Sequence, residues 1–190
     1  MRIAVSALQG DFEEHAEYIR RMGIETLQIR QKKDLEQKFD ALILPGGEST
    51  VQGRLMRKLD ILDELKKRIS DGLPVLATCA GLILLAKDIC NDDTVHLGTL
   101  DVSVQRNAYG TQIDSFHTSG SFLPEGAEIP MSFIRAPAIE RIGNGLEIIA
   151  EYNGRPVAVR QGNQLAMAFH PELGTDDTIL KYFVALVQAR

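Results

Sequence analysis

The sequence predicts an α/β protein with a mostly parallel central sheet flanked by helices, and with antiparallel additions in the C-terminal half. Up to Cys90, short apolar runs alternate with stretches of helical spacing. The apolar runs are hydrophobic at nearly every position, as strands covered on both faces of a parallel sheet are. From Asn91 onward, short alternating segments separated by turn residues replace this pattern, which is typical of antiparallel strands.

The first elements alternate between strand and helix. Residues 3–8 are predicted to form a buried strand, and Gly23 ends the helix that follows. The apolar side chains of that helix are Phe12, Ala16, Ile19 and Met22. Strands near residues 25–29 and over residues 41–44 come next, with a polar connection between them. A further helical stretch follows Pro45-Gly46-Gly47.

Another helix is predicted after Asp60, which we expect to cap its N-terminus. Its apolar face consists of Ile61, Leu62, Leu65 and Ile69. Gly72 supplies the end of this helix. The chain then continues with an apolar run over residues 73–78, small residues at the turn 79–81 and a second apolar run over residues 82–86. This order predicts a strand, a sharp turn and a helix.

The second half contains the strongest hairpin signal of the chain. Residues 146–152 and 156–160 flank Asn153-Gly154, a pair that accepts the positive φ angles of a tight hairpin turn. Strands are also predicted over residues 100–104 and 165–169. Turn residues recur at Asn107, Gly110, Gly120 and Gly126. The chain closes with a helix that carries on one face Ile179, Phe183, Leu186 and Val187.

Composition narrows the class of protein. A chain of 190 residues is long enough for one core, and we expect residues 1–190 to form a single domain. With 44% hydrophobic and 25% charged residues, disordered and fibrous classes drop out. A net charge of -5 without a basic block argues against nucleic acid as the main partner. The apolar runs are too short to span a membrane and no secretory signal is evident, so we expect a cytoplasmic protein.

The two cysteines are not expected to pair. Cys79 and Cys90 are separated by a predicted helix, which holds them too far apart for a disulfide. We assign Cys90, at the expected end of that helix, a structural or surface role. No metal site is predicted, because the cysteines and histidines lack ligand spacing and Asp92-Asp93 and Asp176-Asp177 fit cap or loop positions. No cofactor is expected.

Cys79 is the candidate nucleophile. It stands where the predicted strand meets a helix N-terminus, whose backbone N–H groups and dipole favour a thiolate. A buried structural cysteine is the alternative, since free cysteine packs as a small hydrophobe. The small residues Ala80-Gly81 favour the nucleophile, because they permit the tight turn and leave the sulfur accessible.

His170 and Glu172 are the candidate base and orienting carboxylate. His170-Pro171-Glu172 follows an apolar run, which puts both side chains at the C-terminal edge of a strand, where ligands bind in open parallel sheets. The other histidines are His15, His96 and His117. None of these follows a strand and precedes a carboxylate by two. The alternative is a surface histidine beside an unrelated glutamate. A cysteine, histidine and glutamate together indicate acyl transfer.

Two further features fit such a reaction. The glycines of Pro45-Gly46-Gly47 let backbone N–H groups approach a developing negative charge, as in an oxyanion site. A phosphate-binding loop is the rival interpretation, but the Walker spacing and its lysine are missing; an ordinary loop is the third. Arg106-Asn107 and Arg135 are candidates to bind a substrate carboxylate, because a guanidinium grips it with two hydrogen bonds.

Five motifs together resemble one family, in order and spacing. They are Leu44-Pro45-Gly46-Gly47-Glu48-Ser49-Thr50, Thr78-Cys79-Ala80-Gly81-Leu82, Arg106-Asn107, Phe133-Ile134-Arg135-Ala136-Pro137 and Phe169-His170-Pro171-Glu172-Leu173. The chain resembles the glutaminase subunits of the two-protein pyridoxal 5′-phosphate synthases, within the class I, triad-type glutamine amidotransferases. This resemblance implies a flavodoxin-like amidotransferase fold. One departure is Ala77, where the wider class commonly has glycine two residues before the cysteine.

The resemblance implies hydrolysis of L-glutamine to glutamate and ammonia, with the ammonia delivered to a (β/α)8-barrel synthase subunit in a hetero-oligomer. Cys79 is implied as the nucleophile that forms a glutamyl thioester, His170 as the base and Glu172 as its orienting partner. Gly47 and Ala80 are implied as the oxyanion hole. The implied glutamine-binding residues are Gly47, Glu48, Ser49, Arg106, Ile134 and Arg135. Gln9 and the Gly46-Gly47 loop are implied to rearrange when the synthase docks.

Two alternative functions remain open from the sequence. The chain could be the glutaminase subunit of another amidotransferase, which keeps the chemistry and changes the acceptor of ammonia. It could also be a non-catalytic protein of the same fold that uses Cys79 as a reactive thiol. The second alternative leaves His170 and Glu172 unexplained.

Overall fold

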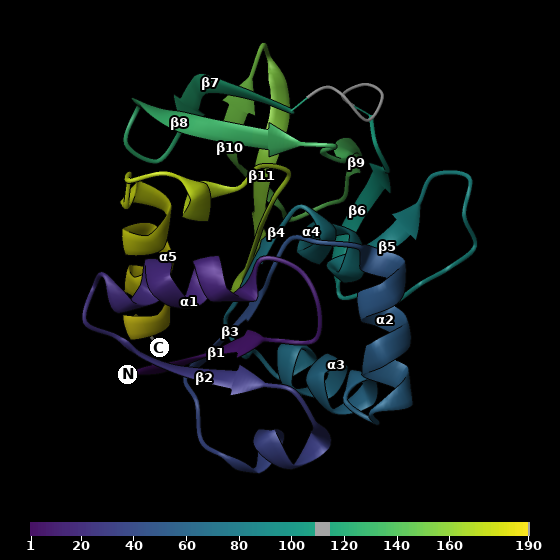
Figure 1. The fold of residues 1–190 in the computed structure, drawn as a ribbon. Helices are drawn as coiled ribbons and strands as arrows, with labels where there is room; N and C mark the ends of the chain where they lie inside the picture. The colour runs from purple at the N-terminus through teal and green to yellow at the C-terminus, as the bar shows by residue number, and fades with distance from the viewer. Residues whose placement is uncertain (109–114, 190) are drawn as a thin grey trace.

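A nine-stranded sheet forms the centre of the computed structural model, which describes residues 1–108 and 115–189 (Figure 1). Its strands are, in spatial order, β2 (Glu25–Ile29), β1 (Arg2–Ser6), β3 (Ala41–Leu44), β4 (Val75–Thr78), β12 (Gln164–Met167), β11 (Arg155–Gln161), β10 (Glu147–Tyr152), β7 (Ser115–Phe122) and β8 (Ala127–Ile134). Pairs from β2 to β12 are parallel, and pairs from β12 to β8 are antiparallel. The α/β class is confirmed.

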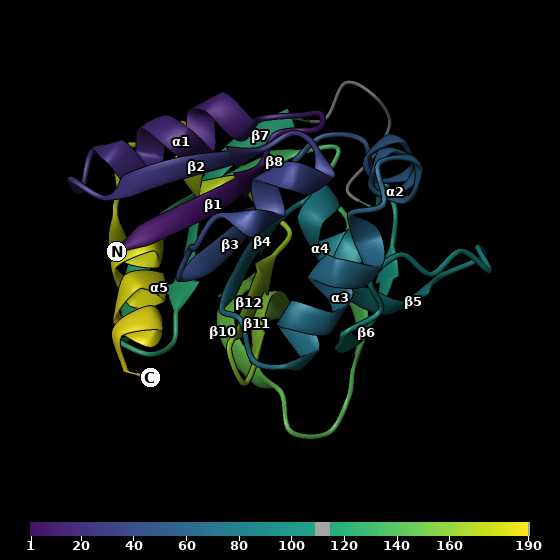
Figure 2. The ribbon, with the colours of Figure 1, turned by 90° about the horizontal axis from the view of Figure 1, so that it is seen from below.

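Helices cover both faces of the parallel part. On one side lie α1 (Phe12–Arg20) and α5 (Thr178–Gln188), and on the other α3 (Leu62–Ser70) and α4 (Ala80–Leu85), as Figure 2 shows from below. A fifth helix, α2 (Ser49–Lys58), packs against α3 and α4. Two 3₁₀ turns are η1 (Lys32–Glu36) and η2 (Pro171–Leu173). Because both faces are covered, every residue of β3 and β4 is buried.

The hairpin and the parallel strands lie where the sequence predicts them. Asn153 and Gly154 have φ values of 50° and 70°, the left-handed pair of a type I′ turn, and they join β10 to β11. The predicted turn residue Gly110 lies outside the described residues. None of the helices within residues 1–108 and 115–189 is long and apolar enough to cross a bilayer.

The expected N-cap Asp60 is wrong. Asp60 has a φ of 54° and ends α2, while Ile61 occupies the cap position of α3. The Ile61 N–H donates to the Met56 carbonyl at 2.9 Å, and the Asp60 N–H to that of Arg57 at 3.1 Å. This is the C-terminal motif in which a left-handed residue closes a helix. Aspartate tolerates that conformation, so it serves here as a stop rather than a start.

The helix after Cys79 is shorter than expected. It ends at Leu85, and β5 (Ala86–Ile89) follows at once, so Cys90 lies after a strand and not at a helix end. With β6 (Leu100–Gln105) and β9 (Ala138–Ile142), β5 forms a three-stranded sheet. The additions are therefore not all antiparallel, because β5 pairs with β6 in parallel. Both cysteines are free thiols, as expected.

Candidate active site

The candidate nucleophile and base come from neighbouring strands. β4 and β12 run in parallel with Thr78 opposite Met167, and the Cys79 N–H donates to the Met167 carbonyl at 2.8 Å. Cys79 follows β4 directly, and His170 follows β12 after two residues. Since the C-terminal ends of parallel strands meet at one edge of the sheet, both side chains reach the same cavity.

The turn at Cys79 is strained and tightly packed. Cys79 has φ 47° and ψ -100°, a conformation that costs a non-glycine residue energy and is typical of nucleophile turns. A methyl group on Gly81 would overlap the Leu44 carbonyl oxygen, so glycine lets α4 sit against the end of β3. Ala77, the departure noted in the sequence, is fully buried between Leu44 and Ala166, and the fold accommodates its methyl group.

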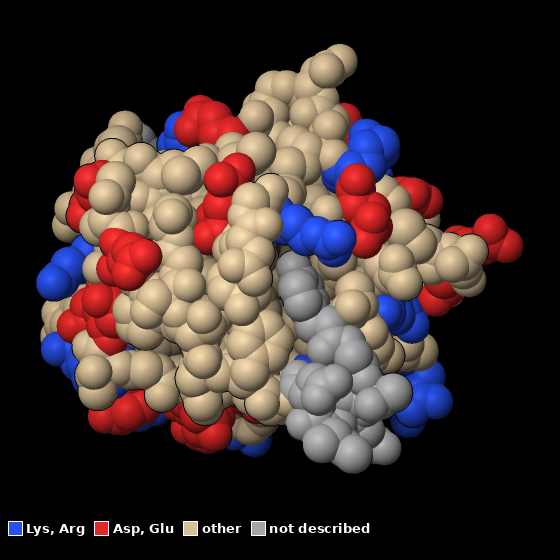
Figure 3. Space-filling view, turned by 90° about the horizontal axis from the view of Figure 1, so that it is seen from above, with Lys and Arg blue, Asp and Glu red and all other residues tan. Residues whose placement is uncertain are grey.

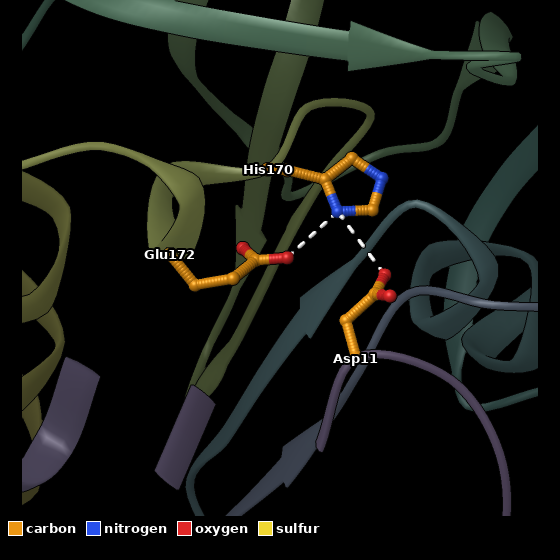
Figure 4. A group of neighbouring side chains, drawn as sticks. All are labelled: Asp11, His170 and Glu172. Carbon is orange, nitrogen blue, oxygen red and sulfur yellow. Dashed lines mark hydrogen bonds and ion pairs between the residues drawn. The ribbon is translucent and has the colours of Figure 1, made fainter. Parts of the chain in front are cut away.

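His170 and Glu172 form a buried pair (Figure 4). His170 Nδ1 donates to Glu172 Oε1 at 2.7 Å, and the side chain of Glu172 has no exposed surface. Pro171 starts η2, and this single turn brings Glu172 back toward the imidazole. A second carboxylate, Asp11 Oδ2, lies 3.6 Å from the same nitrogen. Because both carboxylates accept hydrogen bonds, they favour a proton on Nδ1.

The charges around His170 favour an imidazolium. Burial of the ring disfavours the charged form, but the interactions with the Cys79 side chain and the Glu172 carboxylate outweigh it and raise the pKa of His170 to about 10. Burial by itself would raise the pKa of Glu172. The neighbouring His15 and His170 outweigh this effect and keep the pKa of Glu172 below its usual value. Among the described residues, His170 Nε2 has no hydrogen-bond partner. This arrangement suits a base that exchanges a proton with the thiol and with a substrate.

A second histidine contacts the group. The ring of His15 is fully buried on α1, and its Nε2 lies 3.4 Å from Glu172 Oε2 and 2.9 Å from Thr78 Oγ1. In the sequence His15 is a weaker candidate than His170, because it does not follow a predicted strand and precede a carboxylate by two. The helical spacing of the apolar residues places His15 on the buried face of α1. No local signal in the sequence indicates that its ring contacts the carboxylate of Glu172.

Side chains of Gln9 and Gln52 hydrogen-bond to the predicted oxyanion loop. Gly47 is exposed, with a φ of 135°, and the Glu48 N–H donates to Gln9 Oε1 at 2.8 Å. The buried Gln52 Nε2 donates to the carbonyls of Gln9 at 2.9 Å and Gly46 at 3.0 Å. Ala80 opens α4, so its N–H has no acceptor within that helix. Gln52 is an ordinary polar residue in a helical stretch, so no local signal in the sequence points to it.

A cavity of about 390 Å³ lies at this edge of the sheet. It is lined by the predicted residues Gly47, Glu48, Ser49, Cys79, Arg106, Ile134, Arg135 and His170. Glu172 and Ala80 do not line it, and Glu172 reaches it only through His170. Asp11 and Ile83 line the cavity as well and were not singled out from the sequence. In the view from above, acidic and basic side chains are interspersed over the surface (Figure 3).

Charged side chains in the cavity are already oriented. Arg106 Nη1 donates to Thr50 Oγ1 at 3.1 Å, and its Nη2 lies 3.2 Å from Asp92 Oδ2. The Glu48 carboxylate caps α2, accepting from the N–H groups of Thr50 and Val51. Burial opposes its charge, but these two N–H groups prevail and lower the pKa of Glu48. The cavity therefore offers both a guanidinium and a carboxylate, which fits a zwitterionic ligand.

The chain is similar to known proteins over nearly its whole length. Residues 5–189 match the SNO glutamine amidotransferase family. The chain is similar to the pyridoxal 5'-phosphate synthase subunit PdxT of Desulfitobacterium hafniense strain Y51, with 50% identity over 184 residues, 97% of this chain and 92% of the relative. It is also similar to the protein of that name from Methanocorpusculum labreanum, with 48% identity covering 98% of both chains.

Solved structures agree on the fold. A crystal structure of a glutamine amidotransferase has 45% sequence identity and a TM-score of 0.92, and the match covers 98% of both chains. The structure of PurLQS from Thermotoga maritima has 16% identity and a TM-score of 0.72, covering 99% of this chain and 97% of the other. At that identity the likeness concerns the fold alone.

Proposed function

This chain belongs to the SNO glutamine amidotransferase family, and from this premise we propose that Cys79, His170 and Glu172 hydrolyse L-glutamine to L-glutamate and ammonia. The enzyme is a glutaminase, an amide hydrolase, and serves as the glutaminase subunit of a pyridoxal 5′-phosphate synthase. The observation that carries the residue assignment is the meeting of the Cys79 turn with the buried His170–Glu172 pair at one cavity.

The reaction uses the thiol as a nucleophile. Cys79 Sγ, as the thiolate, attacks the side-chain amide carbon of glutamine, and a C–S bond forms as the carbonyl oxygen takes up the electron pair. His170, as the imidazolium, gives its proton to the leaving nitrogen, and ammonia departs. The γ-glutamyl thioester is then hydrolysed by water, which His170 deprotonates, and the thiolate returns as the leaving group. Glu172 holds the Nδ1 proton of His170 throughout, so that Nε2 faces the reaction.

The oxyanion of the tetrahedral intermediate needs hydrogen-bond donors close to the sulfur that attacks. The N–H groups of Ala80 and Gly47 are the proposed pair: the first is free of the helix, and the second belongs to an exposed glycine that lines the cavity. One such donor is worth roughly 3 kcal/mol of the barrier in other acyl-transfer enzymes. Gln52 supports this role, because its side chain donates to the Gly46 carbonyl in the same loop and to the Gln9 carbonyl in the neighbouring loop after β1.

The amino-acid end of glutamine is bound by charge. We assign the substrate carboxylate to Arg106 and Arg135, and the substrate ammonium to Glu48, whose lowered pKa keeps it ionised. Ser49 and Ile134 complete the wall around the side chain. Asp92 and Thr50 already hold Arg106 in place, which reduces the entropy lost on binding.

The ammonia acceptor is a barrel-type synthase subunit in this proposal. It is supported by the names of the relatives, which describe a synthase subunit and cover nearly the whole chain. We take residues 1–190 as one amidotransferase domain and the cytoplasm as the compartment. Neither a metal nor a cofactor is required for the chemistry described.

The test is glutamate release in the presence of the barrel synthase. Cys79→Ala should abolish the release, while the matched variant Cys90→Ala should retain it, because Cys90 lies outside the cavity next to Ser103. Turnover by Cys79→Ala would contradict the assignment. Capture of a synthase other than the barrel type would favour another amidotransferase, and alkylation of Cys79 without turnover in any complex would favour the reactive-thiol protein.

A further inference from the structure

His15 contacts both the residue before the nucleophile and the carboxylate of the proposed triad. It lies on α1, its ring has no exposed surface, and its Nε2 contacts Glu172 Oε2 at 3.4 Å and Thr78 Oγ1 at 2.9 Å. Thr78 is the last residue of β4 and precedes the nucleophile, while Glu172 orients the base. One imidazole nitrogen is therefore shared between the nucleophile strand and the triad carboxylate.

The neighbours of this nitrogen determine where its proton sits. Glu172 Oε2 is buried and has no hydrogen-bond partner among the described residues. An ionised carboxylate only accepts hydrogen bonds. If Nε2 of His15 were unprotonated, its lone pair would face the Glu172 carboxylate, and the two would repel each other. Since the pKa of Glu172 is low, the favourable tautomer has the proton on Nε2, between Glu172 and Thr78, and leaves Nδ1 as an unpaired acceptor.

We propose that His15 is a positioning residue for the glutaminase reaction: its Nε2–H lies 3.4 Å from the second oxygen of Glu172, and this electrostatic contact keeps the first oxygen on His170. The inference rests on the proposed function, because it assigns Glu172 to the triad. His15 touches neither substrate nor sulfur. Its effect is to prevent the carboxylate from rotating away from His170, a rotation that would move the imidazole relative to Cys79.

His15 suits this task because it remains neutral. Burial of the ring lowers the pKa of His15, although the Glu172 carboxylate acts in the opposite direction. The charged groups that face it are Glu172, His170, Asp11 and Glu14. A neutral donor orients Glu172 without cancelling its charge, so the carboxylate still stabilises the His170 imidazolium.

The test compares two amides that differ in reach. In His15→Gln the side-chain NH₂ extends to the place of Nε2, and in His15→Asn it extends only to that of Nδ1. His15→Leu removes the donor entirely, and His117→Leu is the matched control on an exposed histidine of β7. Each protein is assayed with the barrel synthase for kcat and KM over a range of pH, and its folding is checked by thermal unfolding.

We expect kcat to fall about 10- to 100-fold in His15→Asn and His15→Leu, as for a reacting group displaced by about 1 Å. KM for glutamine should stay within about threefold, since His15 lies outside the cavity. His15→Gln should restore kcat to within about threefold of wild type. If His15→Leu does not fold, the Gln and Asn pair carries the comparison. Equal kcat in Gln and Asn variants, or a wild-type kcat in His15→Asn, would overturn the proposal.

A second readout separates this proposal from the proposed function. The rate of Cys79 alkylation by iodoacetamide reports the thiolate held by His170 and needs no glutamine. It should change its pH profile in His15→Asn and keep it in His15→Gln and His117→Leu. An inactive wild-type complex would refute the glutaminase assignment, while the alkylation profile would still decide the role of His15. Identical profiles in Asn, Gln and wild-type proteins would overturn the positioning role.

Discussion

Gly10 and Gly46 pack backbone against backbone, so closely that a methyl group on Gly10 would overlap the Gly46 carbonyl oxygen. Gly10 has a φ of 95°, a conformation that L side chains rarely adopt. The contact joins the loop after β1 to the loop after β3, and these loops bring Gln9 and Gly47 into the cavity. The position of Gly47, the proposed oxyanion donor, thus depends on the lack of a side chain at Gly10.

Gly10→Ala should therefore be costly. Strain at a positive φ together with the clash predicts a loss of about 2–4 kcal/mol in the free energy of unfolding. The matched control is Gly154→Ala in the β10–β11 turn, where φ is 70° but the space around is open, and about 1–2 kcal/mol is expected. Urea unfolding of both variants measures the difference. Equal losses would show that the contact with Gly46 carries no weight.

His170 should keep its proton well above neutral pH. Its pKa is raised to about 10, and that of an unfolded histidine is about 6.5. The extra proton stabilises the folded state fully below pH 6.5, and this contribution is lost as the pH rises through about 10. Titration of the ¹⁵N-labelled imidazole by NMR measures the value. A midpoint near pH 6.5 would contradict the imidazolium.

Glu172→Gln should separate charge from hydrogen bonding. An amide oxygen can still accept from His170 Nδ1, but the negative charge that favours the imidazolium is removed. We expect kcat to fall at least about 100-fold and the pKa of His170 to decrease. Steady-state kinetics and the same NMR titration test both parts. Glu147→Gln, an exposed glutamate paired with Arg160 on the far hairpin, serves as control; an unchanged His170 titration would exclude the electrostatic role.

Arg106→Gln should weaken substrate binding more than it slows chemistry. Loss of the guanidinium removes the charge assigned to the substrate carboxylate, so KM should rise about 10- to 100-fold, as expected for losing a charged hydrogen bond. Arg141→Gln is the control, because Arg141 is an exposed arginine paired with Asp101 outside the cavity. Glutamine titrations give both constants. An unchanged KM in Arg106→Gln would refute the assignment.

Many of the strands and helices can be predicted from the local sequence pattern. The strands Ala41–Leu44 and Glu25–Ile29 have the predicted bounds, because apolar runs and flanking turns are local signals. Asp60 was misjudged since aspartate suits both a helix start and a left-handed stop, and only the packing of α2 against α3 selects between them. The early end of α4 has a similar cause: β5 pairs with β6, a partner that the apolar run does not reveal.

The candidate site follows the same division. Cys79, His170 and Arg106 stand at element ends or in motifs, so the sequence identified them, and all three line one cavity. His15, Asp11 and Gln52 were missed because their roles depend on which loops meet in space. His15 meets Glu172 only because α1 packs on η2, and no spacing along the chain encodes that contact.

The pairing of β4 with β12 has a consequence for the order in which activity arises. The Cys79 N–H donates to the Met167 carbonyl, and His170, the base we propose, follows three residues after Met167. During synthesis the N-terminal strands emerge first, and they hold the thiol without any base beside it. Non-local strand pairing is also slow to form. In the proposed mechanism, glutamine hydrolysis therefore requires that β12 has paired with β4, because this pairing brings His170 to the Cys79 turn.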